Sequence, residues 1–317
     1  MPLGEFDLIE RYFSRSSSRR DVLLGVGDDA ALLQVPPGQA LVAATDTLVE
    51  GRHFLPDAPP ESVGHQALAV NLSDLAAMGA DPAWALLSLS LPESDERWLK
   101  SFAAGLYALA DNHGVALVGG DTVRGPRVVT ITALGFVPPE SALRRDGARP
   151  GDVLYVSGWP GEAAAGLEAL RREPAADPDD PLVRRYRFAA PRLTLGRTLR
   201  GRASAAMDVS DGLLGDLQKL CAASRVGASL ELARLPVSGE LARRHAREDC
   251  ERFVLFGGDD YELLFTAPVE RAPALEAELS GSIPLHRIGR IESVPGVRCA
   301  RNGQPEDVRG GGYDHFA

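Results

Sequence analysis

The sequence predicts an α/β protein of the α+β kind, with two domains in which helices pack on mixed sheets. Apolar runs of strand length alternate with longer amphipathic segments of helix length along most of the chain. A chain of 317 residues is also longer than one hydrophobic core usually organises. The pattern breaks around residues 138–150, so we expect an N-terminal domain over residues 1–138 and a C-terminal domain over residues 139–317.

The N-terminal domain is expected to begin with a helix and a hairpin. Apolar residues at helical spacing predict a helix over residues 5–15, and strand-like runs follow at residues 21–26, 31–35 and 40–45. The sequence Pro-Pro-Gly at residues 36–38 separates the last two runs, which predicts a hairpin between them.

Helices and strands alternate through the rest of the chain. The next expected elements are helices over residues 61–78 and 94–112 and strands over 84–91, 115–118, 127–137 and 152–157. Residues 172–181 are crowded with Pro and Asp and are expected to form a solvated surface loop. Further along, residues 206–212 are typical of a strand that turns into a helix, where Asp211 could serve as the N-cap.

Composition and charge exclude several classes of function. Subtracting 44 acidic from 34 basic residues gives a net charge of −10, which disfavours nucleic-acid or anionic membrane partners. The lysines are Lys100 and Lys219, and neither follows a glycine, so the chain has no P-loop. No apolar run reaches the ~18 residues of a membrane span. Three widely spaced cysteines indicate neither a zinc site nor a disulfide framework, so we expect a cytoplasmic protein.

Aspartates recur where apolar runs stop. The set comprises Asp28, Asp29, Asp46, Asp121, Asp208, Asp211, Asp259 and Asp260, with Asp74 added from a helix. Any one of them is more often a turn residue, but their recurrence favours a shared site. Clustered carboxylates persist when hard cations such as Mg²⁺ neutralise them, and Mg²⁺ binds phosphate oxygens. The glycine pairs at 119–120 and 257–258 could offer backbone N–H groups to those phosphates.

Four further residues can each be interpreted in two ways. His53, in a polar loop, is either a surface residue or a ligand-binding group. The pair Arg144 and Arg145 is either solvated or clamps phosphate. Tyr313 either packs its tail or contacts a ligand.

Six motifs are distributed along nearly the whole chain. They are Gly-Asp-Asp-Ala at 27–30, Asp-Thr-Leu-Val-Glu-Gly-Arg-His-Phe at 46–54, Asn-Leu-Ser-Asp-Leu-Ala-Ala-Met-Gly-Ala at 71–80, Gly-Gly-Asp-Thr at 119–122, Asp-Val-Ser-Asp-Gly-Leu at 208–213 and Gly-Gly-Asp-Asp-Tyr-Glu-Leu at 257–263. Together they resemble the thiamine-monophosphate kinase family of the aminoimidazole ribonucleotide synthetase-like superfamily. The resemblance implies the two-domain fold of that superfamily and a homodimer. It also implies Mg²⁺-assisted, in-line transfer of the γ-phosphoryl group of ATP to thiamine monophosphate, giving thiamine diphosphate and ADP.

The resemblance also implies roles for individual residues. Asp29, Thr45, Asp46, Asp74, Asp121, Asp208 and Asp211 are implied magnesium ligands, with Ala44 able to contribute only its backbone. The implied ATP contacts are Gly120, Asp121, Arg145 and Ser210, and the implied substrate contacts are His53, Asp259 and Tyr313. The family commonly has Glu where this chain has Asp259. No catalytic base is implied, because the phosphate acceptor is already anionic near neutral pH.

Two alternatives remain. Sister enzymes would be expected to carry a cysteine, near the start in selenophosphate synthetase and at the C-terminus in the hydrogenase maturation factor, whereas this chain begins without one and ends in Ala317. From another class, the chain could be a binding module that keeps the pocket for nucleotide or thiamine phosphate without turnover.

Overall fold

The computed structural model describes residues 4–308 and 310, which divide into two compact units. The first unit contains residues up to Leu75 and from Ala80 to Glu140. The second contains residues 76–79 and the chain from Ser141 onward. Among the described residues, no helix has the length and apolar character needed to cross a bilayer.

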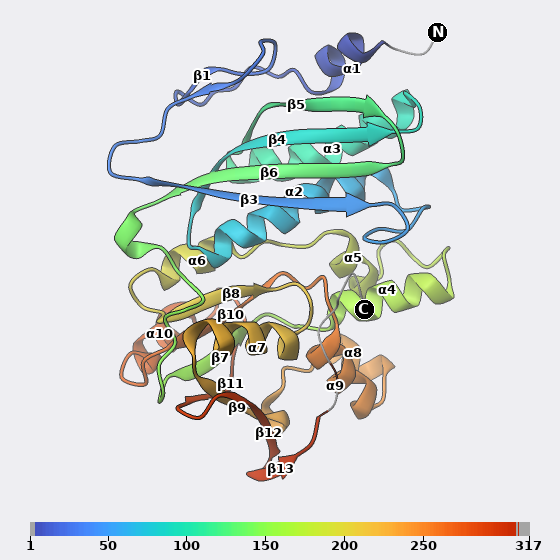
Figure 1. The fold of residues 1–317 in the computed structure, drawn as a ribbon. Coiled ribbons are helices and arrows are strands. Elements are labelled where there is room, and N and C mark those ends of the chain that lie inside the picture. The colour runs from blue at the N-terminus through green and yellow to red at the C-terminus, as the bar shows by residue number, and fades with distance from the viewer. Residues whose placement is uncertain (1–3, 309, 311–317) are drawn as a thin grey trace. The chain divides into compact units, whose positions relative to one another are not determined.

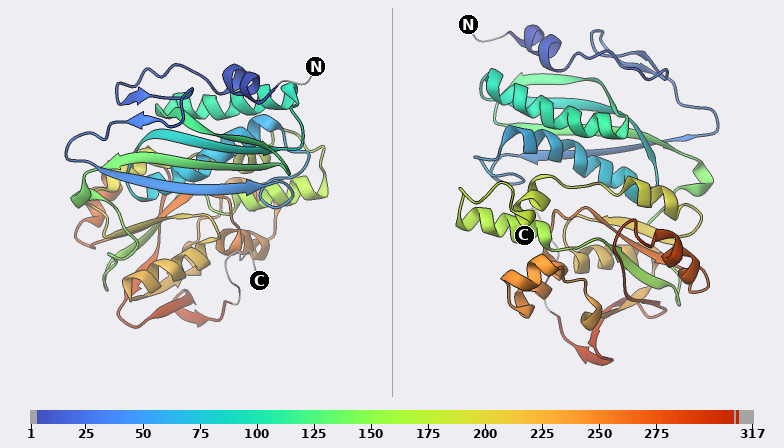
Figure 2. Two further views of the ribbon diagram at one scale, coloured as in Figure 1. Left: turned by 45° about the horizontal axis from the view of Figure 1, so that its top comes forward. Right: turned by 180° about the vertical axis from the view of Figure 1, so that it is seen from behind.

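The first unit is built on a four-stranded sheet in the order β3-β6-β4-β5, covered on one face by two long helices (Figures 1 and 2). Its elements are α1 (Glu5–Tyr12), β1 (Val22–Leu24), β2 (Leu32–Leu33), β3 (Ala40–Val49), α2 (Pro60–Ala77), β4 (Asp81–Leu91), α3 (Glu96–His113), β5 (Ala116–Arg124) and β6 (Val128–Val137). β3 and β5 are the edge strands, and β4 pairs in parallel with β5 and antiparallel with β6.

Helices α2 and α3 approach each other closely because each carries a glycine at the contact. A Cβ on Gly64 would lie 2.1 Å from the carbonyl oxygen of Phe102, and one on Gly105 would lie 1.9 Å from that of Glu61. Asp95 caps the start of α3 by accepting hydrogen bonds from the backbone N–H groups of Arg97 and Trp98.

The expected hairpin of residues 31–35 with residues 40–45 is wrong. β2 pairs with β1, and β3 pairs with β6 over its full length. The β3–β6 ladder has ten residue pairs, so it forms more backbone hydrogen bonds than a hairpin between runs of five and six residues could. The β1–β2 pair instead packs on a cluster that includes Trp84, Val118 and Phe136, and the indole of Trp84 donates to Asp21 (3.1 Å).

The second unit holds a seven-stranded sheet in the order β13-β12-β9-β11-β7-β10-β8. Its strands are β7 (Val153–Ser157), β8 (Ala205–Val209), β9 (Gly227–Glu231), β10 (Glu262–Ala267), β11 (Leu285–Glu292), β12 (Gly296–Arg301) and β13 (Gln304–Glu306). Its helices are α4 (Glu162–Arg172), α5 (Pro181–Arg187), α6 (Leu193–Leu199), α7 (Leu213–Ser224), α8 (Gly239–Arg244), α9 (Arg247–Phe256) and α10 (Ala272–Leu279), and short 3-10 turns lie at Pro139–Ser141 and Leu232–Arg234.

The core of this unit lies between the sheet and the helices α7 and α9. Leu154, Val156, Leu217, Val254 and Leu264 belong to one buried cluster that joins strands β7 and β10 to these helices. Burial of this apolar surface fixes the turns at which β8 ends and β10 begins. Both turns carry motif residues.

Candidate active site

Acidic and glycine residues far apart in the sequence line one pocket of the first unit. The pocket has a volume of about 790 Å³ and is lined by Asp28 and Asp29 from the loop after β1 and by Gly119, Gly120 and Asp121 from β5. Apolar side chains complete it, among them Phe6, Ile9, Phe13, Leu33, Leu86 and Leu117. A mostly apolar hollow with a few convergent polar groups is the usual form of a small-molecule site.

A β-bulge shapes the glycine wall of this pocket. Ala85 and Leu86 of β4 pair with Leu117 and Gly119 of β5, so Val118 is the extra residue. Gly120 follows with φ 151°, and a Cβ there would lie 1.7 Å from the carbonyl oxygen of Leu87. A side chain is therefore excluded at this position, and the backbone of Gly120 itself borders the pocket.

Asp121 belongs to a polar row that crosses the sheet. It pairs with Ser88 of β4, which pairs with Thr130 of β6, which in turn pairs with Thr47 of β3. Paired residues in a sheet share a face, so these side chains lie together on the face opposite the helices. The hydroxyls of Thr47 and Thr130 are hydrogen-bonded at 2.8 Å, and the adjacent row carries a second pair, Thr45 and Thr132, at 3.0 Å.

Asp46 leaves the sheet on the other face. It pairs with Ile131 of β6, which is fully buried. Ile131 pairs with Leu87 of β4, which in turn pairs with Gly120 of β5. The strands of Asp46 and Asp121 are separated by β6 and β4, a distance of about 14 Å at normal strand spacing. The sequence suggested that both aspartates stand at strand ends. Neither does, because β3 continues to Val49 and β5 continues to Arg124.

The remaining predicted residues of this unit lie on β3, on α2 and in the loop after β3. Ala44 is half-buried in β3 and pairs with Ala133. Asp74 is half-buried on α2. The backbone N–H of Val49 donates to Nδ1 of His53 (3.0 Å), so the neutral ring carries its proton on Nε2.

In the second unit, Asp208 lies in β8, and Ser210 and Asp211 lie in the turn that follows it. Asp208 is buried within β8. The expected capping role of Asp211 is wrong, because Gly212 occupies the N-cap of α7. The buried carboxylate of Asp216, in the first turn of α7, instead accepts from the backbone N–H groups of Ser210 and Asp211, both at 3.1 Å.

Lys219 completes this turn, although it belongs to none of the motifs from which site residues were predicted. Its ammonium group donates to Asp211 (2.6 Å) and to Asp216 (2.8 Å). Burial raises the pKa of Asp216, and the hydrogen bond from Lys219 opposes that rise. The signal available in the sequence was the i, i+3 spacing of Asp216 and Lys219 in a chain with two lysines.

Asp259 lies beside the same turn. Its backbone N–H donates to the carbonyl oxygen of Ser210 (2.9 Å), and its carboxylate accepts from the hydroxyl of Tyr261 (3.1 Å). Burial raises the pKa of Asp259 to about 6, and the negative charge of Asp211 contributes to the rise. The unit thus brings Ser210, Asp211 and Asp259 together.

The remaining predicted contacts of this unit are Arg145 and Tyr313. Arg145 is exposed, and its carbonyl oxygen accepts from the hydroxyl of Ser224 (2.7 Å). Tyr313 lies outside the described residues.

The donor set of each unit fits magnesium. Within residues 4–308 and 310, no three His, Cys, Asp or Glu side chains lie close enough together to hold a metal ion by themselves. Mg²⁺ does not need such a cage, because it is usually bound by one or two carboxylates, water and substrate phosphates. Carboxylate and hydroxyl oxygens, with no thiolate or imidazole cluster among the described residues, are the hard donors that it prefers.

Both halves of the chain match domains of a known protein family. Residues 27–137 match the N-terminal domain of AIR synthase related proteins, and residues 149–300 match the C-terminal domain of the same proteins. The chain is 49% identical to the thiamine-monophosphate kinase of Escherichia coli (strain K12) over 323 aligned residues, which cover 100% of this chain and 99% of the relative.

Solved structures of the same kind share the fold. The crystal structure of thiamine-monophosphate kinase from Stenotrophomonas maltophilia K279a superposes with a TM-score of 0.87 at 46% identity, covering 96% of this chain and 99% of that one. A structure described as AaThiL complexed with AMPPCP and TMP gives a TM-score of 0.79 at 34% identity and covers 92% of both chains. The predicted fold class is thereby confirmed. The chain belongs to the thiamine-monophosphate kinase family of the AIR synthase related proteins.

Proposed function

We propose that this chain transfers the γ-phosphoryl group of ATP directly to the phosphate of thiamine monophosphate, in line and with Mg²⁺. The kinase reaction follows from membership of the family. The observation that carries the mechanism is the pocket in which Asp29, Gly120 and Asp121 meet. The glycine backbone can approach phosphate oxygens closely because it carries no side chain, and the two exposed carboxylates can bind the divalent cation that accompanies those phosphates.

The metal-binding role is assigned to the oxygen donors of both units. These are Asp29, the Ala44 carbonyl, Thr45, Asp46, Asp74, Asp121, Asp208 and Asp211. When bound, Mg²⁺ supplies positive charge that lowers the repulsion between the two polyanionic substrates. The aspartates hold the reactants in place, and no residue is required as a strong base, because the attacking phosphate oxygen is already ionised.

The substrates are assigned to the remaining motif residues. Gly120, Asp121, Arg145 and Ser210 are proposed to contact ATP. His53, Asp259 and Tyr313 are proposed to contact thiamine monophosphate, with Tyr313 lying against the cationic thiazolium ring at a gain of about 0.5–2 kcal/mol. AMPPCP and TMP are present together in the related AaThiL complex, which supports a site for a nucleotide and a thiamine phosphate in one protein.

The assembly is proposed to be a cytoplasmic homodimer. In this assignment, residues 1–138 carry the metal and ATP loops and the dimer interface, and residues 139–317 complete the metal and substrate sites. Strand β3 is the candidate for this interface, because it is a ten-residue edge strand on which the side chain of Leu41 is 48% exposed. A long edge strand offers unpaired backbone groups with which another chain can pair.

One assay tests the proposed reaction. Purified protein is mixed with ATP, Mg²⁺ and thiamine monophosphate, and the products are resolved by chromatography. We expect thiamine diphosphate and ADP in equal amounts, and little product from other phosphorylated acceptors. Binding of both substrates without product would instead indicate a binding module, and ADP without thiamine diphosphate would contradict direct transfer.

A further inference from the structure

The loop between α9 and β10 holds two residues in a conformation that non-glycine residues rarely adopt. Asp259 has φ 65° and Tyr261 has φ 53°, both in the left-handed region. Such backbone costs free energy and persists only where its surroundings enforce it. The enforcing contacts are therefore informative, because this loop carries the residue assigned above to the thiamine phosphate.

Part of the enforcement comes from the turn after β8. The backbone N–H groups of Asp259 and Tyr261 donate to the carbonyl oxygens of Ser210 and Val209, both at 2.9 Å. The Tyr261 hydroxyl donates to the carboxylate of Asp259. These bonds fix the direction of Asp259 and tie it to the turn of Asp211.

Asp260 anchors the loop from its other side. Its side chain is fully buried and accepts from the backbone N–H groups of Gly161 (2.6 Å) and Ala163 (3.3 Å), at the start of α4. Its carbonyl oxygen accepts from the guanidinium of Arg185 (2.8 Å). The residue next to Asp259 is therefore held at both its side chain and its backbone.

The anchor depends on a buried ion cluster centred on Glu262. This fully buried carboxylate accepts from Ser157 (2.5 Å), Arg185 (2.5 Å) and Arg192 (2.7 Å). Arg185 thus joins the carboxylate of Glu262 to the carbonyl of Asp260. A buried charge with several partners is costly to disrupt, which makes the cluster a rigid support.

We propose that the Glu262 cluster, formed by Glu262, Ser157, Arg185 and Arg192, is a positioning device that sets the carboxylate of Asp259 for thiamine monophosphate. The inference rests on the substrate role proposed for Asp259. Glu262 and the two arginines act through the loop and do not themselves contact substrate. Tyr261 is a positioning residue of the same device.

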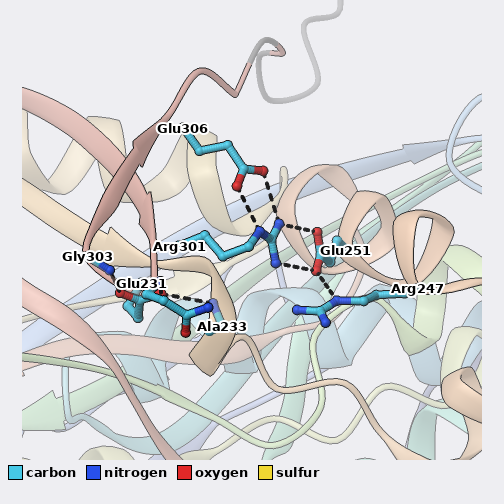
Figure 3. A network of polar contacts seen from close by, with 8 residues as sticks. Glu231, Ala233, Arg247, Glu251, Arg301, Gly303 and Glu306 are labelled. Carbon is cyan, nitrogen blue, oxygen red and sulfur yellow. Dashed lines mark hydrogen bonds and ion pairs between the residues drawn. The ribbon is translucent and has the colours of Figure 1, made fainter.

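The chain offers a matched control for the central carboxylate. Glu251 is also a glutamate held by two arginines, Arg247 at 2.9 Å and Arg301 at 2.8 Å (Figure 3). It lies on α9 outside the loop 257–261. The variants Glu262→Gln and Glu251→Gln therefore remove the same charge from two glutamates that are each bound by two arginines, one fully buried and one 16% exposed.

The experiment measures steady-state kinetics and amide hydrogen exchange for both variants at a temperature where circular dichroism shows them folded. For Glu262→Gln we expect the KM for thiamine monophosphate to rise about tenfold or more, with a smaller change in the KM for ATP. Amides of residues 257–262 should exchange faster. Glu251→Gln should leave both readouts within about twofold of the wild type.

If Glu262→Gln does not fold, Tyr261→Phe replaces it as the test variant. Its control is Tyr155→Phe, because the Tyr155 hydroxyl donates to Glu276 (2.5 Å) and not to a residue of the loop 257–261. We expect the same rise in KM from Tyr261→Phe and none from Tyr155→Phe. Unchanged KM and exchange in folded Glu262→Gln would overturn the positioning role alone. An unchanged KM in Asp259→Asn would overturn the substrate role of Asp259 and this proposal with it.

Discussion

The ammonium nitrogen of Lys219 lies 2.6 Å from Oδ2 of Asp211, a residue proposed to bind magnesium. This carboxylate is therefore paired with a cation of the chain itself. Lys219 is held in place by its second bond, to the buried Asp216. The pair suggests that Lys219 competes with the metal for Asp211.

Replacing Lys219 by Gln is therefore expected to strengthen activation by magnesium. Loss of the positive charge leaves Asp211 more negative, so the Mg²⁺ concentration for half-maximal activity should fall about threefold or more. A magnesium titration at saturating ATP measures it. A higher magnesium requirement in the variant would show that Lys219 supports the metal site.

Asp46→Asn should affect turnover far more than folding. The substitution removes charge from an exposed position of β3 and no packing, so we expect kcat to fall about 100-fold or more while the unfolding free energy changes by less than about 0.5 kcal/mol. Asp57→Asn, an exposed aspartate in the same unit, is the control. Near-normal turnover of Asp46→Asn at saturating Mg²⁺ would argue against a metal-binding role.

Gly64→Ala should destabilise the chain although alanine favours helices. In an open helix the change would stabilise by about 1 kcal/mol. Here the new Cβ would lie 2.1 Å from the Phe102 carbonyl oxygen, so we expect a net loss of about 1–3 kcal/mol. Urea denaturation measures the effect, with Gly239→Ala as a control because its new Cβ would meet only the flexible end of Arg243. An increase in stability would mean that the helices can move apart.

Asp260 should make the free energy of unfolding decrease as the pH rises. Burial raises the pKa of Asp260 to about 8 from an unfolded value near 3.9. Between these values the folded chain binds more protons than the unfolded chain, so the stabilising effect of the neutral acid is full below about pH 4 and is lost as the pH rises to about 8. Urea midpoints for the wild type and Asp260→Asn test this. The variant should show the smaller decline, and parallel curves would contradict the assignment.

Prediction from the sequence succeeded where motifs carry the information and failed where contacts are long-range. The family, the fold class and the kinase activity are confirmed by the comparisons. The hairpin of residues 31–35 with 40–45 failed, because turn residues at 36–38 show that the chain turns and not which strand it then pairs with. Pairing was decided by β6, far along the chain.

The support of the site was not predictable for a similar reason. Glu262 follows Asp260 and Tyr261 in an obvious motif, but its partners Arg185, Arg192 and Ser157 are 70 or more residues away. Nothing in their local sequence distinguishes these arginines from solvated ones. The roles given to the aspartates, and the homodimer, stay predictions.

Metal binding in the presence of a nucleotide analogue tests the central claim most directly. Mn²⁺, as a paramagnetic substitute for Mg²⁺, is titrated into the protein with AMPPCP and followed by electron paramagnetic resonance, for the wild type, Asp121→Asn, Asp211→Asn and Asp57→Asn. We predict that the Asp121 and Asp211 variants bind about tenfold or more weakly, or lose a bound ion, while Asp57→Asn does not change. Equal affinity and equal stoichiometry in all four proteins would contradict the claim that these aspartates hold the catalytic metal.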